Sequence, residues 1–273
     1  MFNENEYIIQ IEPDCKSRSY HWKTAIGLQK VDGLTPSKYL IETANANIQG
    51  DITLAEANQL ITTYYEQKPS VTDEQKRTEE ADKVSLHIAQ ILANRTFKLS
   101  LSEILSIHRQ LFDGVFIFAG QLRECNISKE EWVLNGESVI YDDFRTVRDS
   151  IEYDLEKEKS FNYSGLDERK MIEHIADFIS DLWQIHAFRE GNTRTIAVFT
   201  IKYLRTFGYD VTNDIFEHNS WYFRNALVRA NYNNRKINIL STPIYLYRFF
   251  GNMLLGDEHE LSNRELHIKQ ANL

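Results

Sequence analysis

The amino-acid sequence predicts an all-α fold, and three observations support this prediction. Only 11 glycines and 4 prolines occur among the 273 residues, about half the share of an average globular chain. Apolar residues recur at helical spacing from about residue 81 onward. The 42% hydrophobic content, with 15 Phe, 14 Tyr and 4 Trp, is enough for a packed core and excludes a disordered or fibrous chain.

The charge balance limits the classes of partner. With 31 basic and 40 acidic residues the net charge is −9. This argues against a general nucleic-acid or anionic-membrane binder, because phosphate affinity needs basic surface. A local positive pocket for a nucleotide is still compatible with it. The longest uncharged runs, Val84–Asn94 and Ile237–Tyr247, are too short to span a bilayer, so we expect no membrane-spanning helix.

Two further features bear on the compartment. Residues Met1–Glu6 lack the basic residues of a signal peptide. The two cysteines, Cys15 and Cys125, could form at most one disulfide and do not have the spacing of a metal site. We therefore expect a cytoplasmic protein. Its length of 273 residues is enough for one large domain or two small ones.

Residues 1–70 are expected to form an N-terminal helical segment. The first part has mixed character, with a short apolar alternation at Tyr7–Ile11. Pro36 then marks the first turn of a helix, where its missing N–H costs nothing. This helix should run to about Ile48 and end at Gly50.

A second helix should begin at Thr53, because Thr53 and Glu56 form a capping box, and should continue to about Gln67. The charged residues 71–80 are interpreted as a linker. Residues 81–256 are then expected to form the main domain, and residues 257–273 a C-terminal tail.

Helical apolar spacing runs through the main domain. Its first stripes are Ala81–Ile91, Leu101–Leu111, Phe144–Leu155 and Ile172–Leu182. A helix from about Thr193 to Thr206 is apolar on most faces, so it should lie at the domain centre. Two more helices are expected near Trp221–Asn231 and Ile244–Leu255.

One segment interrupts the helical pattern. Asn135-Gly136 lies between two short β-prone runs within Trp132–Ile140, which is the strongest local signal for a β-hairpin. Because a lone hairpin is only marginally stable, we expect it to lean on the helices as a small flap over a site.

The segment His186–Arg194 carries the chemistry. It is a short loop that ends at a helix N-terminus, where free N–H groups and the helix dipole favour an anion. Gly191 lets a ligand approach the backbone, and Arg194 adds a charged donor for a polyanion. Glu190 could hold Mg²⁺ against phosphates, and His186 has the chemistry of a general base.

Each of these residues alone also fits a purely structural interpretation. A histidine at a helix end is usually a satisfied core residue, and a Glu-Gly-Asn turn is usually a pair of helix caps. His186 and Glu190 are spaced like a metal pair, but the glycine that follows argues against a zinc site. Three other histidines in helical stripes are expected to be core or surface residues, namely His87, His108 and His174.

Taken together, the segment resembles the signature of the Fic (Fic/Doc) family, His-x-Phe-x-(Asp/Glu)-Gly-Asn-Gly-Arg-x-x-Arg. The matching positions are His186, Phe188, Glu190, Gly191, Asn192 and Arg194. Phe118–Ile127 is similar to the family's segment that leads into its flap. Phe223 and Asn231 match positions on the helix that closes the adenine side of the family's pocket. The resemblance covers about residues 80–255.

The resemblance implies a Fic-type helical bundle and a protein adenylyltransferase, which moves AMP from ATP to a Ser, Thr or Tyr hydroxyl. It implies that His186 takes the hydroxyl proton and that Glu190 holds Mg²⁺ on the phosphates. The other nucleotide contacts that it implies are Gly191, Asn192, Thr193, Arg194, Phe223 and Asn231.

The resemblance also implies how a target is held. The flap, which includes Ile127, Ser128 and Lys129, would clamp an extended segment of the target protein by strand addition. The target could be another protein or the chain itself, and a homodimer is one arrangement open to it. Neither nucleic acid nor a membrane is an expected partner.

Two positions depart from the signature. Thr193 stands where the family has glycine, and Ala197 stands where it has its last arginine, which in the family meets the γ-phosphate. Some members without this arginine transfer a phosphate, so a Doc-like phosphotransferase or another nucleotide transferase is one alternative. A catalytically degenerate interaction module is another, although the intact His186 and Glu190 argue against it.

Asn45–Gly50 resembles the family's inhibitory motif, (Ser/Thr)-x-x-x-Glu-(Gly/Asn), with Asn45, Gln49 and Gly50 at its defining positions. The glutamate that pairs with the last arginine in inhibited members is replaced by Gln49. Because a buried charge without its partner is costly, the joint loss with Ala197 is physically coherent. We hypothesise that this helix packs beside the active site and inhibits weakly or only sterically. A purely structural helical hairpin is the alternative.

Overall fold

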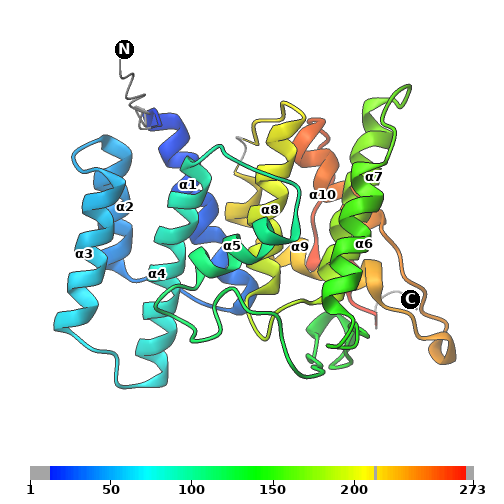
Figure 1. Cartoon of the computed structure of the whole chain (residues 1–273), viewed down its shortest axis with the longest axis horizontal. Helices are drawn as coiled ribbons and strands as arrows, with labels where there is room; N and C mark the ends of the chain where they lie inside the picture. The colour runs from blue at the N-terminus through cyan, green and yellow to red at the C-terminus, as the bar shows by residue number, and fades with distance from the viewer. Residues whose placement is uncertain (1–12, 212–213, 269–273) are drawn as a thin grey trace, which may run out of the picture.

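The computed structural model of the chain describes residues 13–211 and 214–268, which fold into helices joined by loops (Figure 1). In these ranges there is no strand, and the β-type pairing is a single bridge between Asn234 and Ile239. The prediction of an all-α fold is confirmed. The apolar alternation at Tyr7–Ile11 lies outside the described residues.

The helices follow one another along the chain in the order labelled in Figure 1. They are α1 Cys15–Leu28, α2 Lys38–Gln49, α3 Leu54–Gln67, α4 Asp73–Ala93, α5 Leu101–Leu111, α6 Val147–Lys159, α7 Glu168–Ile185, α8 Asn192–Thr206, α9 Ile215–Asn231, α10 Ile244–Leu254 and α11 Asn263–Leu266. Short 3₁₀ helices lie between some of them: η1 Gln29–Asp32, η2 Trp132–Leu134 and η3 Arg235–Ile237. None of the helices in the described ranges is long and apolar enough to cross a bilayer.

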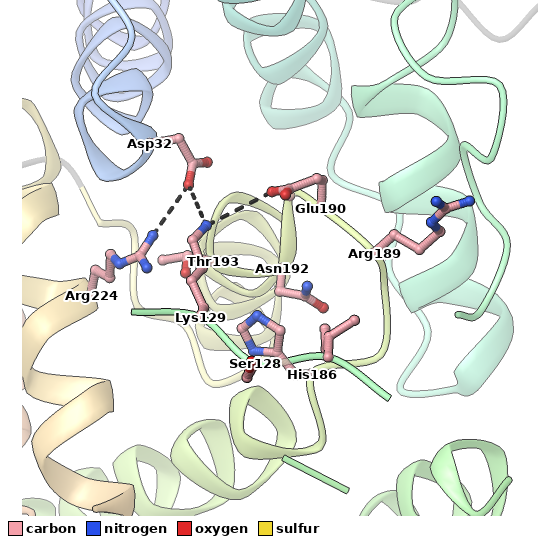
Figure 2. Close-up of a pocket in the computed structure, with 11 residues that line it drawn as sticks. Asp32, Ser128, Lys129, His186, Arg189, Glu190, Asn192, Thr193 and Arg224 are labelled. Carbon is pink, nitrogen blue, oxygen red and sulfur yellow. Dashed lines mark hydrogen bonds and ion pairs between the residues drawn. The ribbon is translucent and has the colours of Figure 1, made fainter. Parts of the chain in front are cut away.

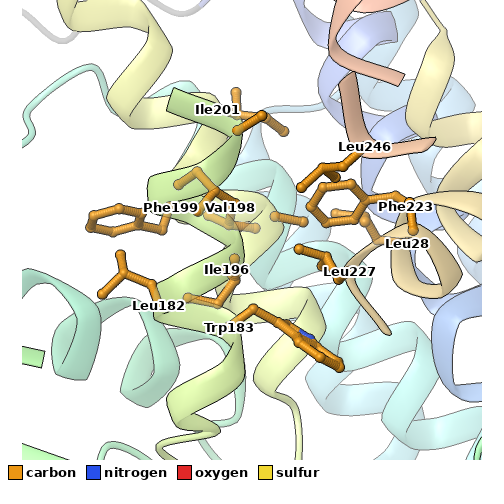
Figure 3. Packing of buried hydrophobic residues seen from close by; sticks show 14 of the residues in the cluster. Leu28, Leu182, Trp183, Ile196, Val198, Phe199, Ile201, Phe223, Leu227 and Leu246 are labelled. Atoms are coloured by element: carbon orange, nitrogen blue, oxygen red, sulfur yellow. The ribbon is translucent and has the colours of Figure 1, made fainter. Parts of the chain in front are cut away.

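Helix α8 lies at the centre of the molecule, as its apolar pattern predicts. All its residues from Asn192 to Leu204 are buried. Figure 3 shows its side chains among those of the neighbouring helices, including Leu182 of α7 and Phe223 of α9. The helix that begins at the signature loop is therefore held on all sides.

Helix α1 was not predicted, because polar residues such as His21 and Thr24 interrupt its buried face. Its start is nevertheless capped by the Asp14 side chain, which accepts from the Ser17 N–H at 2.7 Å. Tyr20, Ala25 and Leu28 belong to the main core. At Gly27 an added Cβ would lie 2.4 Å from the backbone of α9, so glycine allows the two helices to touch.

Helices α2 and α3 form a helical hairpin with its own small apolar cluster. The predicted capping box of Thr53 and Glu56 is confirmed for α3. Helix α2 begins at Lys38 with Ser37 as its cap, so Pro36 lies before the helix and not in its first turn as predicted. The cluster comprises Trp22, Leu40, Ala44, Ala57, Ile61, Tyr65, Leu86 and Ala89. The hairpin is thus attached to the rest of the molecule through α1 and α4.

Helix α4 begins at Asp73, so residues 73–80 are helical and the predicted linker is wrong for them. Thr72 accepts from the Gln75 N–H, and the Gln75 side chain accepts from the Thr72 N–H. Charged residues then support the exposed face, as in the ion pair between Lys83 and Glu79 at 2.6 Å. A dense run of charges here marks a solvated helix instead of a linker.

Part of the predicted C-terminal tail packs on the core. Leu266 of α11 and Ile268 are buried. The Ile268 N–H donates to the carbonyl oxygen of Val133 at 3.0 Å. Residues 257–268 are therefore not a free tail, because they cover the segment around η2.

Candidate active site

The signature segment forms a tight loop between α7 and α8. His186 follows the last residue of α7 in the left-handed conformation, with φ of 52°. Gly191 precedes α8 with φ of 78°. The side chain of Asn192, the first residue of α8, reaches back across the loop. It accepts from the Phe188 N–H at 2.8 Å and donates to the Phe188 carbonyl oxygen at 2.7 Å. The Asn192 amide therefore closes the loop and holds its backbone.

Glycine is required at position 191. A Cβ there would lie 2.2 Å from Cζ of Phe112, and the positive φ already disfavours any other residue. Phe112 is completely buried, so it cannot move aside easily. Gly191 thus lets the loop pass directly over this ring where α8 begins.

The N-terminus of α8 faces a cavity. Gly191, Asn192 and Thr193 line it, and the first N–H groups of a helix have no acceptor within that helix. Together with the helix dipole they attract an anion. The Thr193 hydroxyl accepts from Nε1 of Trp183 at 3.0 Å, so the residue that replaces the signature's glycine satisfies a buried donor.

His186 is buried in the same cavity. Its ring stacks on Tyr141 with centroids 3.9 Å apart. Its Nδ1 lies 3.3 Å from the carbonyl oxygen of Trp183, and because a carbonyl only accepts, the proton is assigned to Nδ1. Burial, followed by the charge of Lys129, lowers the pKa of His186 to about 3. The imidazole is neutral near pH 7, and its Nε2 can accept a proton.

Arg123 supports this loop, and sequence reasoning did not identify it. Its Nε donates to the carbonyl oxygen of His186 at 2.8 Å, and its Nη1 to that of Cys125 at 2.9 Å. Its Nη2 donates to the carbonyl oxygen of Asp142, while its backbone N–H donates to that of Ala187 at 3.0 Å. In the sequence, Arg123 is marked only as part of the segment Phe118–Ile127 that leads into the flap.

His108 supports the loop from α5. Its ring stacks on Phe188 with centroids 3.7 Å apart. The Gly120 N–H donates to its Nδ1 at 2.8 Å, so Nε2 carries the proton and donates to the carbonyl oxygen of Glu190 at 3.1 Å. Burial lowers the pKa of His108 to about 4. The residue predicted to be a core or surface filler is a neutral core histidine that holds the backbone of Glu190.

Glu190 is the residue that could hold Mg²⁺. Its side chain is 54% exposed, and its Oε2 lies 3.8 Å from Nζ of Lys129. In the described ranges no three or more His, Cys, Asp or Glu residues are grouped so that they could hold a metal by themselves. Mg²⁺ usually binds through one or two carboxylates together with phosphates and water, so Glu190 fits this ion when phosphates share it.

Arg194 is held by carboxylates of the chain itself, whereas we expected it to be available to a polyanion. Its Nε lies 2.9 Å from Oδ2 of Asp32, and its Nη2 lies 2.7 Å from Oε1 of Glu80. Arg224 and Lys129 approach the other oxygen of Asp32, at 3.2 and 3.5 Å (Figure 2). Burial raises the pKa of Asp32, but the three positive charges outweigh it and lower this pKa.

These side chains enclose a cavity of about 180 Å³ (Figure 2). Its lining consists of Asp32, Ile127, Ser128, Lys129, His186, Arg189, Glu190, Gly191, Asn192, Thr193 and Arg224. A larger cavity of about 680 Å³ shares four of these residues, namely Asp32, Lys129, Glu190 and Arg224. The two cavities therefore adjoin along these four residues.

Ile127, Ser128 and Lys129 lie along one side of the smaller cavity, where the flap was expected. Their backbone belongs to no helix or strand. The Lys129 N–H donates to the hydroxyl of Ser138 at 3.0 Å. The segment therefore presents an irregular edge beside His186.

The predicted β-hairpin is not present in this flap. Asn135 and Gly136 do reverse the chain, with φ of 58° and 90°, the left-handed pair that such a turn needs. The Glu131 N–H donates to the carbonyl oxygen of Glu137 at 3.0 Å, but no ladder follows. The buried carboxylate of Glu131 also binds Nη2 of Arg224 at 2.7 Å, so this arm is fastened to α9 as well as to the other arm.

Two residues predicted on the adenine side lie outside this cavity. Phe223 is completely buried, with its ring 5.0 Å from that of Phe249. Asn231 donates to the hydroxyl of Ser180 at 2.8 Å and lines a separate cavity. Arg224 faces the site instead, because neighbouring residues on a helix point in different directions.

The inhibitory-motif-like residues also lie away from the cavity. Asn45, Gln49 and Gly50 are exposed, and the neighbours of α2 are α1 and α3 (Figure 1). The hypothesis that this helix packs beside the active site is therefore wrong. Its buried face, which includes Asn47, is taken up by the helical hairpin. The N-terminal segment reaches the site through Asp32 of η1.

Comparisons with known proteins match the region that builds this site. A model of the Fic/DOC family matches residues 98–204. Protein adenylyltransferase VbhT of Bartonella schoenbuchensis is 27% identical over 164 residues, which are 59% of this chain and 33% of that protein. Probable protein adenylyltransferase Fic of Escherichia coli is 27% identical over 121 residues, 44% of this chain and 58% of that protein.

The chain thus spans between a third and three fifths of the curated relatives that it matches. Among solved structures, a Fic family protein from Desulfovibrio desulfuricans matches 93% of this chain and 66% of its own chain. The TM-score is 0.53 and the sequence identity 13%, so this similarity concerns the fold alone.

Proposed function

The chain is a Fic family protein, and we propose that it is a protein adenylyltransferase that moves AMP from ATP to a Ser, Thr or Tyr hydroxyl. The observation that carries this proposal is the neutral, buried imidazole of His186 beside the N-terminus of α8. Glu190 lies in the same cavity. A base, an anion site and a free carboxylate are the groups that nucleotidyl transfer needs.

In the proposed reaction, Nε2 of His186 accepts the proton of the target hydroxyl. The hydroxyl oxygen then bonds to the α-phosphorus of ATP. The bond from this phosphorus to the bridging oxygen of the β-phosphate breaks, and pyrophosphate leaves with the electron pair. The Nδ1–H of His186 remains directed at the carbonyl oxygen of Trp183, which keeps the ring oriented as it becomes positively charged.

The phosphates are held by the first turn of α8. N–H groups from Gly191 to Thr193 are placed to stabilise charge that develops on the α-phosphate. Glu190 would hold Mg²⁺, which when bound neutralises part of the phosphate charge. Ile127, Ser128 and Lys129 form the edge along which an extended target segment would lie.

We further infer a reducing compartment such as the cytoplasm, because Cys15 and Cys125 are both free and exposed. The target is another protein or a second copy of the chain, and the chain could also act as a homodimer. Size-exclusion chromatography with light scattering distinguishes a monomer from a dimer.

Ala197 favours a second candidate function, transfer of a phosphate. Ala197 is completely buried on α8. Because its side chain is uncharged, this position supplies no cation to a terminal phosphate. A nucleotide bound in another orientation would present its γ-phosphorus to the hydroxyl oxygen, and ADP would leave instead of pyrophosphate.

The test is the intact mass of the purified chain, and of proteins in a cell extract, after incubation with Mg²⁺ and ATP labelled at either the α- or the γ-phosphate. His186→Ala is compared with His218→Ala, whose side chain is 66% exposed on α9. Incorporation of the α-label that only His186→Ala abolishes supports adenylyl transfer.

The other outcomes contradict the proposal. Incorporation of the γ-label alone replaces it with phosphate transfer. Incorporation of neither label, into the chain or into any protein of the extract, leaves the catalytically degenerate interaction module as the better account. Equal incorporation by His186→Ala and the natural chain removes His186 as the base.

A further inference from the structure

The imidazole of His186 has no acidic partner. Its Nδ1–H is directed at the carbonyl oxygen of Trp183, and among the described residues no hydrogen bond or ion pair joins the ring to a carboxylate. Two carboxylates line the same cavity, but Asp32 and Glu190 contact Nζ of Lys129, at 3.5 and 3.8 Å. In the Ser-His-Asp arrangement a buried aspartate stabilises the imidazolium that forms when the histidine accepts a proton. Another group has to do this here.

The surroundings of His186 disfavour a positive charge. Burial is the largest cause of the lowered pKa of His186. Three cations from the flap, α9 and the start of the flap lower this pKa further, namely Lys129, Arg224 and Arg123. The proton that Nε2 accepts during transfer therefore arrives in a buried and positively charged environment. The cost of placing it there is part of the barrier of the reaction.

The ring of Tyr141 faces the imidazole. The two ring centroids lie 3.9 Å apart, and the ring planes are inclined by 22°. The face of an aromatic ring carries the negative part of its quadrupole and attracts a cation stacked on it. This attraction is stronger away from water, and both Tyr141 and His186 are buried. The stack therefore favours the imidazolium over the neutral imidazole.

Tyr141 is held in this position through its neighbours in the sequence. The Gln184 side chain of α7 donates to the carbonyl oxygen of Ile140. The Arg123 guanidinium donates to the carbonyl oxygen of Asp142. Burial, followed by the charge of a nearby glutamate, raises the pKa of Tyr141. The phenol is therefore neutral, and what it presents to His186 is the face of its ring.

We propose that Tyr141 stabilises the imidazolium of His186 during nucleotidyl transfer, and so does the work of the acidic partner that this histidine lacks. This inference rests on the proposed function, because it takes His186 as the base. Tyr141 is a positioning residue, since it acts through His186 and not on the substrate. Phosphates bound at the start of α8 would attract the imidazolium as well, but that attraction is the same in all the variants below.

The test varies the electron density of the ring at nearly constant shape. Tyr141→Phe is the reference. Phenylalanines that carry one, three or five fluorine atoms are placed at the same position in the full chain, because each fluorine withdraws electron density from the ring face. The probe is ATP labelled at the α-phosphate, with Mg²⁺. The rate of label transfer to the chain or to a protein of a cell extract gives kcat and the KM for ATP.

We expect kcat to fall steadily with the number of fluorine atoms, by about tenfold over the whole series. The KM for ATP should stay constant, because the imidazole is neutral until the hydroxyl proton arrives. A ring that only fills space would give the same kcat throughout. Tyr141→Leu, which removes the ring face, should be at least as slow as the ring with five fluorine atoms. If Tyr141→Leu does not fold, the fluorinated series decides by itself.

The matched control is the same series of fluorinated rings at Phe250 of α10. This ring is completely buried, and its ring contacts are with Phe223 and Phe249. The same change in electron density is thus made in the core, away from His186. We expect kcat to be equal in all members of this control series.

Three outcomes overturn the inference and leave the proposed function in place, because label transfer is still observed. The first is a kcat that is equal for all rings at position 141. The second is a rise in the KM for ATP at constant kcat, which would make Tyr141 part of the nucleotide site. The third is an equal fall of kcat in the Phe250 series.

The label also separates this inference from the proposed function. If the natural chain transfers the γ-label instead, adenylyl transfer is refuted. The fluorinated series is then read in the same way, since His186 would accept the hydroxyl proton in phosphate transfer too. Absence of any transfer by the natural chain would overturn both.

Discussion

Nε of Arg123 donates to the carbonyl oxygen of His186 at 2.8 Å, across 63 positions of the sequence. The proposed base is therefore positioned by a buried guanidinium from the start of the flap. Because the same guanidinium binds carbonyl oxygens of Cys125 and Asp142, it joins the flap and the loop after α7 into one unit.

Substitution of Arg123 should weaken both the fold and the activity. Arg123→Ala leaves several buried carbonyl oxygens without a donor, and we expect a loss of roughly 3 kcal/mol or more in the free energy of unfolding. The loss for Arg123→Lys should lie between that of Arg123→Ala and zero, because an ammonium carries the charge but cannot reproduce the planar donor fork of a guanidinium. Urea unfolding measures this, with Arg148→Ala, whose side chain is 58% exposed, as the control. Equal losses in Arg123→Ala and Arg148→Ala would refute the positioning role.

Gly191→Ala should be far more damaging than alanine at another glycine with positive φ. Gly165 has φ of 82° with no atom within 4 Å of an added Cβ, so Gly165→Ala should cost about 1–2 kcal/mol from backbone strain alone. Gly191→Ala adds a collision with Phe112. The double variant Gly191→Ala/Phe112→Leu should regain part of the lost stability, because the costs of residues in contact are not additive. Thermal unfolding of the set measures this; fully additive losses would contradict it.

Restoring the signature's glycine at position 193 should destabilise this protein. Thr193→Gly removes the acceptor of the buried Trp183 Nε1 and adds glycine's cost in a helix, for roughly 2–3 kcal/mol in total. Thr193→Ser keeps the hydroxyl and should lose much less. If chemical denaturation finds the two variants equally stable, the hydrogen bond to Trp183 contributes nothing.

Stability should fall when the pH drops below about 6.5. Burial is the first cause that lowers the pKa values of His186 and His21 to about 3 and that of His108 to about 4, from 6.5 in the unfolded chain. Between the folded-state and unfolded-state pKa values, the unfolded chain binds more protons than the folded chain. The free energy of unfolding therefore rises with pH, and the contribution of these histidines is fully present above about pH 6.5.

The measurement is urea unfolding at pH 5, 6 and 7. Each such histidine contributes up to about 1.4 kcal/mol per pH unit to the free energy of unfolding. His21→Gln, which keeps an acceptor near Arg205, should make the dependence shallower by one such share. A free energy of unfolding that stays constant from pH 7 to pH 5 would show that these imidazoles are not held neutral.

Much of the fold and the central loop could be predicted from the sequence, because the relevant signals are local. Apolar periodicity located α8 as a buried helix, and the capping box of Thr53 and Glu56 marked the start of α3. The residues from His186 to Arg194 each fit a structural role when taken alone, and only together do they resemble the Fic signature. The same local signals missed α1, because polar residues interrupt its buried face and one of them, His21, contacts Arg205 of a distant helix.

Only the tertiary structure decided which charges meet. Gln49 had the position of an inhibitory residue in the sequence, yet it is exposed on α2, and Asp32 reaches the cations instead. Likewise Arg224 lines the cavity while its neighbour Phe223 is buried in the core. Spacing along the chain determines periodicity and caps, which depend on residues a few positions apart. Ion pairs between segments depend on how whole helices pack, and no local pattern encodes that packing.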